Sequence, residues 1–107
     1  ALMGSGLEGQ RFAFHGYLPV DEAALGARLR ALEAASRRER ATQAFIETPY
    51  RNDRMLRTIL QHCGPATLLC VATNLTQPDE SIRTQEVAAW RREAAEIGKR
   101  PTVFVLL

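Results

Sequence analysis

Residues 47–51 place a carboxylate, a hydroxyl, a proline, a phenol and a guanidinium in direct succession after an apolar stretch that ends at Ile46. The stretch indicates a buried strand, and a threonine followed by a proline is common chemistry for a helix start. In open α/β sheets, ligands bind in the crevice outside such strand ends. The first candidates for a binding or catalytic site are therefore Glu47, Thr48, Tyr50 and Arg51.

The same segment also has a purely structural interpretation. Thr48 would cap the helix, Glu47 would interact favourably with the helix dipole, and the two residues that follow Pro49 would lie on the surface. Three arginines share one broad face of the helix that follows: Arg51, Arg54 and Arg57. That face could contact phosphates or could simply be solvated. Composition and spacing leave both interpretations open.

The overall composition is that of an ordinary small domain. The chain has 107 residues, of which 46% are hydrophobic and 24% charged. This suffices for one domain with a modest core. A net charge of +2 is too small to indicate nucleic-acid binding by itself. No apolar run approaches the ~20 residues that a membrane helix needs, and no signal-peptide pattern is visible. We expect a cytoplasmic protein without membrane contact.

Potential metal ligands and nucleophiles show no recognised motif. The two histidines and two cysteines lack the spacing of a zinc site: His15, His62, Cys63 and Cys70. No nucleophile elbow is present either. His15, near a strand end, could be functional, although such a histidine is more often structural. We expect reduced cysteines and no metal site, and the catalytic residues stay unknown.

Hydrophobic periodicity predicts alternating strands and helices along the chain. Strands are expected at 11–17, 42–47, 66–72 and 101–107, with a short edge strand at 81–83. Helices are expected to begin at Asp21, Thr48 and Thr84, and the second and third are expected to end at Gly64 and Gly98. Residues 66–72 are apolar throughout, which is typical of a strand covered on both faces. The prediction is one α/β layer structure with a polar crevice.

Three segments occur in an order and spacing that are typical of one enzyme superfamily: residues 14–19, 42–51 and 71–76. Together they resemble the carboxyl-terminal half of the tetrapyrrole methylase superfamily of S-adenosylmethionine-dependent methyltransferases. Within it, the nearest resemblance is to the ribosomal RNA small subunit methyltransferase I branch. That branch has a Gly-Phe-Leu-Pro turn, a Tyr-Glu-Ser/Ala-Pro-His-Arg strand end and an Arg-Glu-Leu-Thr-Lys loop, and the three segments carry related sequences.

The resemblance implies a two-lobed protein with its cofactor, S-adenosylmethionine, in the cleft between the lobes. Residues 1–10 would be the interlobe connection, and residues 11–107 the carboxyl-terminal lobe. The amino-terminal lobe would be absent from this chain, which we expect to be a fragment. The lobe present would hold a mixed α/β sheet of about five strands flanked by three helices. A single lobe is expected to be inactive, and the full protein is expected to be a homodimer.

The resemblance also implies where the cofactor lies. In relatives, adenine meets backbone groups at the end of the strand at 42–47 and the start of the strand at 101–103, and the start of this chain would fall near the same pocket. The expected cofactor contacts are Ala1, Leu2, Ile46, Glu47, Pro101, Thr102 and Val103. The expected substrate contacts are Tyr50, Arg51 and Thr76.

The chain departs from the rRNA branch where that branch is basic. Lysine and arginine usually follow the Leu-Pro turn there, whereas residues 20–24 here are Val-Asp-Glu-Ala-Ala. The charged residues around the Leu-Thr pair are replaced by Thr73, Asn74 and Gln77. The lysine and arginine after the turn, and the arginine and lysine replaced by Thr73 and Gln77, are positive charges missing here from a surface that would contact phosphates. We expect the rRNA ribose 2′-hydroxyl as methyl acceptor. The alternatives are a tetrapyrrole or other small-molecule methylase, or a non-catalytic binding module.

Overall fold

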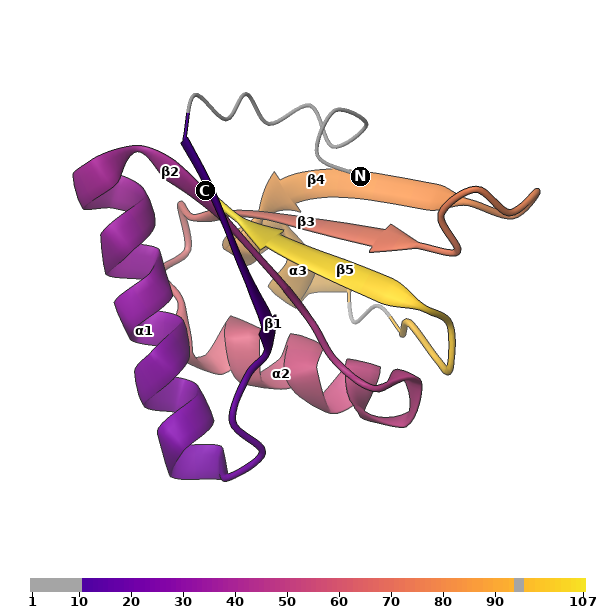
Figure 1. Ribbon diagram of the computed structural model, residues 1–107, viewed down its shortest axis with the longest axis horizontal. Coiled ribbons are helices and arrows are strands. Elements are labelled where there is room, and N and C mark those ends of the chain that lie inside the picture. The colour runs from indigo at the N-terminus through magenta and orange to yellow at the C-terminus, as the bar shows by residue number, and fades with distance from the viewer. Residues whose placement is uncertain (1–10, 94–95) are drawn as a thin grey trace.

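Five strands form a single mixed sheet in the computed structural model, which describes residues 11–93 and 96–107 (Figure 1). In sheet order the strands are β1 (Arg11–Tyr17), β2 (Ala41–Ile46), β5 (Thr102–Leu106), β3 (Leu68–Thr73) and β4 (Ser81–Glu86). β1 and β2 are parallel, and the other neighbouring pairs are antiparallel. The expected mixed α/β sheet is therefore confirmed.

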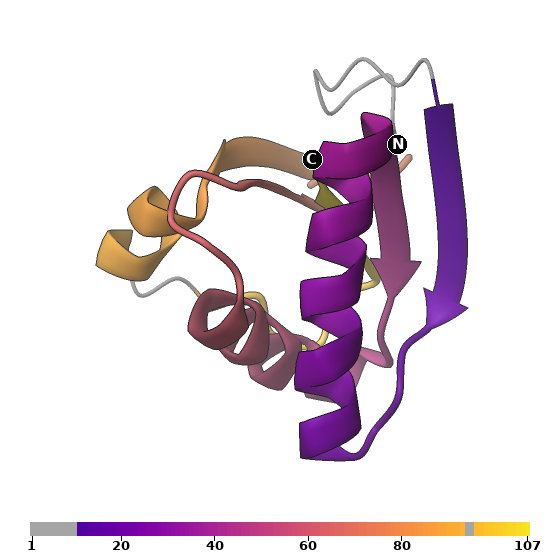
Figure 2. The same ribbon diagram turned by 90° about the vertical axis from the view of Figure 1, so that its left-hand side faces the viewer.

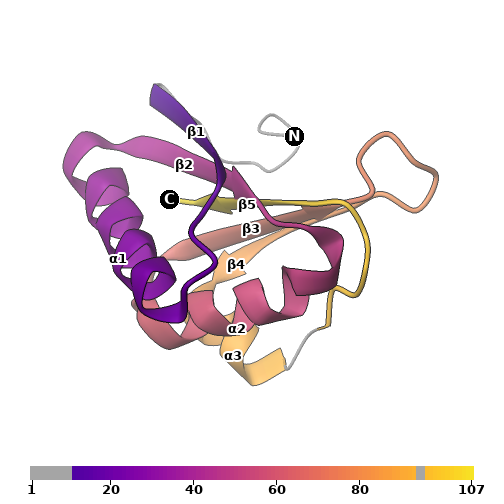
Figure 3. The ribbon, with the colours of Figure 1, turned by 60° about the horizontal axis from the view of Figure 1, so that its bottom comes forward.

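Three helices lie on one side of this sheet (Figures 2 and 3). They are α1 (Glu22–Glu39), α2 (Asn52–His62) and α3 (Val87–Glu93). Asp21 is the N-cap of α1, and its carboxylate accepts a hydrogen bond from the Ala24 N–H at 3.0 Å. A 3₁₀ turn, Pro49–Arg51, leads into α2. Among the described residues, no helix is long and apolar enough to cross a membrane.

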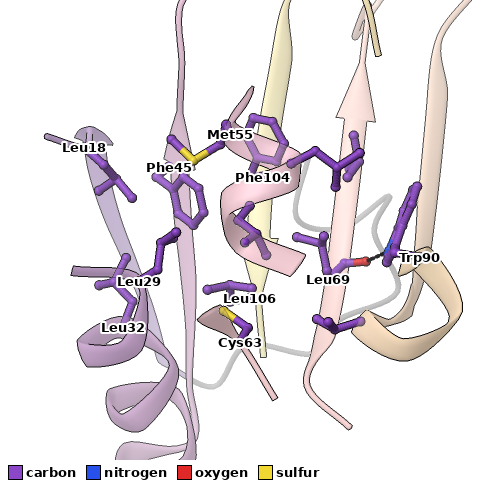
Figure 4. Close-up of a cluster of buried hydrophobic side chains, with 14 of the residues drawn as sticks. Leu18, Leu29, Leu32, Phe45, Met55, Cys63, Leu69, Trp90, Phe104 and Leu106 are labelled. Atoms are coloured by element: carbon purple, nitrogen blue, oxygen red, sulfur yellow. Dashed lines mark hydrogen bonds between the residues drawn. The ribbon is translucent and has the colours of Figure 1, made fainter. Parts of the chain in front are cut away.

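The main core fills the space between the sheet and the helices (Figure 4). The rings of Phe45 on β2 and Phe104 on β5 stack with centroids 5.7 Å apart. Leu29 of α1 and Met55 of α2 belong to the same buried cluster. On the other side of the core, the Trp90 indole N–H of α3 donates to the Leu69 carbonyl at 2.9 Å. The buried polar tip of this tryptophan is thereby satisfied.

The order of the strands determines where the site can be. β2 and β3 both run antiparallel to β5. The carboxyl ends of β2 and β3 therefore lie beside the amino end of β5. At these strand ends Ile46 pairs with Val103, and Thr73 pairs with Thr102. The segments after β2, after β3 and before β5 are therefore neighbours, although they are far apart in the sequence.

The start of the third helix differs from the sequence prediction. Thr84 was expected to be its N-cap, but it lies within β4, opposite Cys70 of β3, and the helix begins at Val87. β4 pairs with β3 along its full length, from Ser81 to Glu86. A ladder of main-chain hydrogen bonds outweighs the roughly 1 kcal/mol that one capping bond contributes. α3 is described over Val87–Glu93, and residues 96–98 are not helical, so the helix ends before the expected Gly98.

Candidate functional site

A pocket of about 340 Å³ opens beside the strand ends, where β2 and β3 end and β5 begins. This volume lies within the range of small-molecule sites. Its lining residues are Tyr17, Ile46, Glu47, Pro49, Asn74, Leu75, Gln77, Pro101, Thr102 and Val103. Five of the seven expected cofactor contacts are among them, and they come from two distant segments. The other two, Ala1 and Leu2, lie outside the described residues.

Glu47 forms the wall of the pocket at the end of β2. Its side chain is only 3% exposed. The carboxylate oxygen Oε1 accepts a hydrogen bond from the Thr48 backbone N–H at 2.7 Å and lies 3.4 Å from Nε of Arg51. The neighbouring hydroxyl of Thr48 makes no capping bond to the turn that follows, so Thr48 caps by position alone. The carboxylate is thus buried, paired with a cation and hydrogen-bonded to the backbone N–H of the next residue.

The start of α2 holds the opposite wall in place. Asn52 is fully buried, and its Nδ2 donates to the Arg100 carbonyl at 2.6 Å and to the Thr102 hydroxyl at 3.1 Å. The Asp53 carboxylate accepts a hydrogen bond from the Ile97 backbone N–H at 2.6 Å. These bonds attach the loop before β5 to the helix. Sequence reasoning missed both residues, because an amide and a carboxylate in a first helical turn look like ordinary surface residues.

The loop after β3 forms the third wall. Asn74 and Thr76 have φ values of 50° and 67°, in the left-handed region that residues other than glycine rarely adopt. The loop is fixed by several bonds: the Asn74 N–H donates to the Pro101 carbonyl at 2.9 Å, and its Nδ2 donates to Asp79 Oδ2 at 3.0 Å. Strained backbone of this kind is common at functional sites. The only sequence feature that pointed to this loop was its polar composition directly after a buried strand.

The expected substrate contacts lie beside the pocket rather than in its lining. Tyr50 is 67% exposed, and the guanidinium of Arg51 lies over its ring, 4.9 Å from the centroid. Both follow directly after the lining residue Pro49. Thr76 lies between the lining residues Leu75 and Gln77, and its N–H donates to Glu80 Oε1 at 3.0 Å. These side chains can contact a molecule larger than the pocket itself.

The histidines and cysteines hold no metal site within the described part of the chain, where no suitable cluster of ligands occurs. Nε2 of His15 lies 2.6 Å from Gln43 Oε1, and its Nδ1 lies 3.2 Å from Arg28 Nη2. Both ring nitrogens thus have partners, as in a structural histidine. Cys63 is buried, and burial together with the nearby Glu33 raises the pKa of its thiol to about 12. Such a thiol is unsuited to nucleophilic attack.

Comparison with known proteins identifies the fold. No protein-family model matches the chain. The chain is similar to the methyltransferase CobJ (TM-score 0.61, 23% identity, covering 99% of this chain and 45% of CobJ). It is also similar to the cobalt precorrin-4 methyltransferase CbiF (TM-score 0.57, 18% identity, 98% and 45% covered). The fold is that of the tetrapyrrole methylases. A third structure with this fold is uroporphyrin-III C-methyltransferase from Thermus thermophilus in complex with S-adenosyl homocysteine (TM-score 0.54, 16% identity, 94% and 42% covered).

A sequence relative gives a finer comparison within the tetrapyrrole methylases. Over 98% of its length, the chain is 38% identical to Ribosomal RNA small subunit methyltransferase I of Micromonospora olivasterospora. The resemblance to the tetrapyrrole methylases, and within them to the rRNA branch, is confirmed. The chain spans about a third of the length of this curated relative and less than half of each solved chain.

Proposed function

We propose that the pocket binds the adenosine part of S-adenosylmethionine, and that the chain supplies half of the cofactor cleft of a methyltransferase. The observation that carries the proposal is the meeting of Ile46 and Glu47 with residues 101–103 around one pocket. These are the positions at which the resemblance implies cofactor contacts. The sequence relative is a methyltransferase, and one structural relative was crystallised with S-adenosyl homocysteine.

The lining suits an adenosine group. Ile46, Leu75 and Val103 provide apolar surface for a flat purine ring, while Glu47 and Asn74 provide polar groups that select its orientation. S-adenosylmethionine, when bound, supplies a methyl group activated by the positive sulfur. The residues of this chain bind and orient the cofactor, and alignment of two reactants is by itself a large source of rate enhancement.

We propose the rRNA ribose 2′-hydroxyl as the methyl acceptor. The name of the 38% identical relative supports this class of substrate. The exposed pair of Tyr50 and Arg51 beside the pocket adds support, since aromatic rings stack on unpaired RNA bases and guanidinium groups bind phosphates. Thr76, on the strained loop, is the third residue that we place toward the acceptor.

The experiment uses the protein at its natural length. Calorimetry with S-adenosylmethionine and S-adenosyl homocysteine should show binding of both, and absence of heat with either ligand would refute the cofactor proposal. Transfer of a labelled methyl group is then measured with small-subunit rRNA and with a tetrapyrrole as separate acceptors. Label in an alkali-resistant dinucleotide indicates ribose methylation. Label in the tetrapyrrole alone would refute the rRNA proposal and leave the cofactor proposal standing.

We also propose that the natural protein is a cytoplasmic homodimer of two-lobed chains, in which residues 1–10 connect the lobes and 11–107 form the carboxyl-terminal one. The support is the resemblance to two-lobed dimeric enzymes. Half a cleft cannot enclose a cofactor, so the isolated chain should not transfer methyl groups. Light scattering on the natural protein should give twice the mass of one chain. A monomer that methylates its acceptor would contradict the proposed dimer.

A further inference from the structure

Glu47 places a carboxylate in the pocket that the surrounding structure uses only in part. Its bonds within the described part of the chain all go to Oε1, from the Thr48 N–H at 2.7 Å, the Thr48 hydroxyl at 3.4 Å and Arg51 Nε at 3.4 Å. The second oxygen, Oε2, has no hydrogen-bond partner among these residues. The side chain as a whole is only 3% exposed, so little water reaches the carboxylate.

Several other polar groups of the lining are already engaged. The Thr102 hydroxyl donates to the Arg100 carbonyl at 2.8 Å and accepts from Asn52 Nδ2. The Asn74 side-chain amide donates to Asp79 Oδ2. The Thr102 hydroxyl and one N–H of the Asn74 amide are therefore used within the protein, while a fixed acceptor is left at Glu47. Such a pocket favours a ligand that brings its own N–H or O–H donor.

Arg51 holds this acceptor in place. Its Nε lies 3.4 Å from Oε1, and its side chain is 28% exposed. The partner cation offsets the cost of holding a carboxylate out of water. Because Arg51 and the Thr48 N–H both contact Oε1, the carboxylate cannot rotate away without losing two bonds. A donor that approaches Oε2 therefore meets an acceptor that is already oriented.

We infer that Glu47 is a specificity-determining residue, whose Oε2 accepts a hydrogen bond from a donor group of the adenosine part of the ligand. This inference rests on the proposed function. It differs from recognition by backbone groups alone, which is what the resemblance implies at this position. Adenosine carries two kinds of donor, the 6-amino group of the base and the hydroxyl groups of the ribose.

Ligand analogues test the inference on the unmodified natural protein. S-adenosyl homocysteine is compared by calorimetry with S-inosyl homocysteine, whose base has an oxygen in place of the amine, and with the 2′-deoxy and 3′-deoxy analogues. Loss of a hydrogen bond to a charged group should weaken binding by about ten- to a hundredfold. The analogue that binds more weakly than S-adenosyl homocysteine identifies the donor group. Equal affinities for all four ligands would overturn the inference.

The variant Glu47→Gln tests the protein side. A glutamine can still accept the Thr48 N–H, but it can place an amide donor where Oε2 stands. We expect this variant to bind S-adenosyl homocysteine more weakly than the natural protein does. The difference in affinity between S-adenosyl homocysteine and the analogue that lacks the donor should also become smaller. Glu39→Gln makes the same chemical change on the exposed end of α1, where Glu39 pairs with Arg38, and should leave both quantities unchanged.

The outcomes separate this inference from the proposed function. If the natural protein binds S-adenosyl homocysteine and Glu47→Gln discriminates among the analogues as before, the role of Glu47 is refuted and the cofactor proposal stands. If the natural protein binds none of the four ligands, both proposals fail. If Glu47→Gln does not fold, as thermal melting would show, the analogue series on the unmodified protein decides.

Discussion

At the scale of single residues, the site depends on buried polar groups whose partners are close to them in the sequence. The pair of Glu47 and Arg51 is an example, because the carboxylate is nearly enclosed whereas the guanidinium is partly solvated. Removing the cation leaves a buried charge with a single backbone donor. Such an uncompensated charge is more costly than the intact pair is stabilising.

Replacing Arg51 by alanine should therefore destabilise the protein by about 1–2 kcal/mol, a value reduced for the exposure of the arginine. Urea denaturation of the natural protein measures this change. Arg57→Ala, on the exposed part of the same helix, serves as the control and should change stability by less than about 0.5 kcal/mol. Equal effects of the two substitutions would contradict the importance of the ion pair.

The Cys63 thiol predicts a pH dependence of stability. Its pKa is about 12 in the folded protein, because burial and the charge of Glu33 disfavour the thiolate, against about 8.5 for an unperturbed cysteine. The unfolded chain releases this proton first, so the contribution to stability is complete below pH 8.5 and is lost as the pH rises toward 12. Urea denaturation at pH 7, 9 and 10 should show a steeper loss for the natural protein than for Cys63→Ala. Parallel curves would contradict the shift.

At the scale of elements, helix packing and loop attachment position the pocket. α1 and α2 pack against each other through a glycine of α1, Gly26, and through His62 at the end of α2. A Cβ atom at Gly26 would lie 2.7 Å from His62 Cε1 and Nε2. Nδ1 of the same ring lies 2.6 Å from Arg30 Nη1, so the ring cannot move without losing that contact.

Gly26→Ala should gain about 1 kcal/mol of stability when His62 is also alanine, since alanine is the better helix former and the obstructing ring is gone. When His62 is present, the same substitution should raise the stability by less than this or should destabilise the protein, because the imidazole ring must move. A double-mutant cycle by thermal or urea denaturation measures the difference. Additive effects would show that the ring imposes no constraint at Gly26.

The attachment of the β5 loop to α2 predicts an effect on binding at a distance from the ligand. Asp53 is a positioning residue, because it contacts the Ile97 N–H rather than the pocket. Asp53→Ala should loosen residues 97–102 and weaken binding of S-adenosyl homocysteine by about tenfold, the loss of one charge-assisted hydrogen bond.

Asp53→Asn keeps an acceptor oxygen and should restore most of that affinity. Calorimetry on the three proteins measures the effect, with thermal melting in parallel. If Asp53→Ala lowered the melting temperature but left the affinity unchanged, the residue would have a structural role only.

At the scale of the whole molecule, the sheet separates two buried layers. Cys63 belongs to the large core beneath the helices, whereas Cys70 lies with Ala44 and Val105 in a smaller buried cluster. Both thiols are at most 2% exposed. Each thiol is therefore enclosed by a different set of neighbours.

Because both thiols are almost completely buried, we expect them to react with a disulfide reagent only through global unfolding. In native buffer both should modify slowly and at the same rate, and both should react at once in denaturant. Mass spectrometry of the partly labelled protein measures the two sites separately. Early modification of one cysteine would show that its layer opens independently.

Much of the fold could be predicted from local patterns. Strand 11–17, the N-cap Asp21 and the buried strand near residue 70 follow from hydrophobic spacing and capping chemistry, and the structure confirms them. The prediction at Thr84 was wrong because a threonine can cap a helix or lie in a strand. Only pairing with β3 decides between the two states, and that partner is distant in the sequence.

Local sequence patterns were enough to predict the order of the elements, the resemblance to the tetrapyrrole methylases and the segments in which a site was expected. Strand ends, caps and apolar periods are local, so they can be recognised without knowledge of the fold. Three features became visible only in the folded chain: Ile46 pairs with Val103, Asn52 and Asp53 hold the loop before β5, and the Glu47 carboxylate is buried. These facts depend on which strands pair and which helix packs against them, and contacts between distant segments leave no local signal.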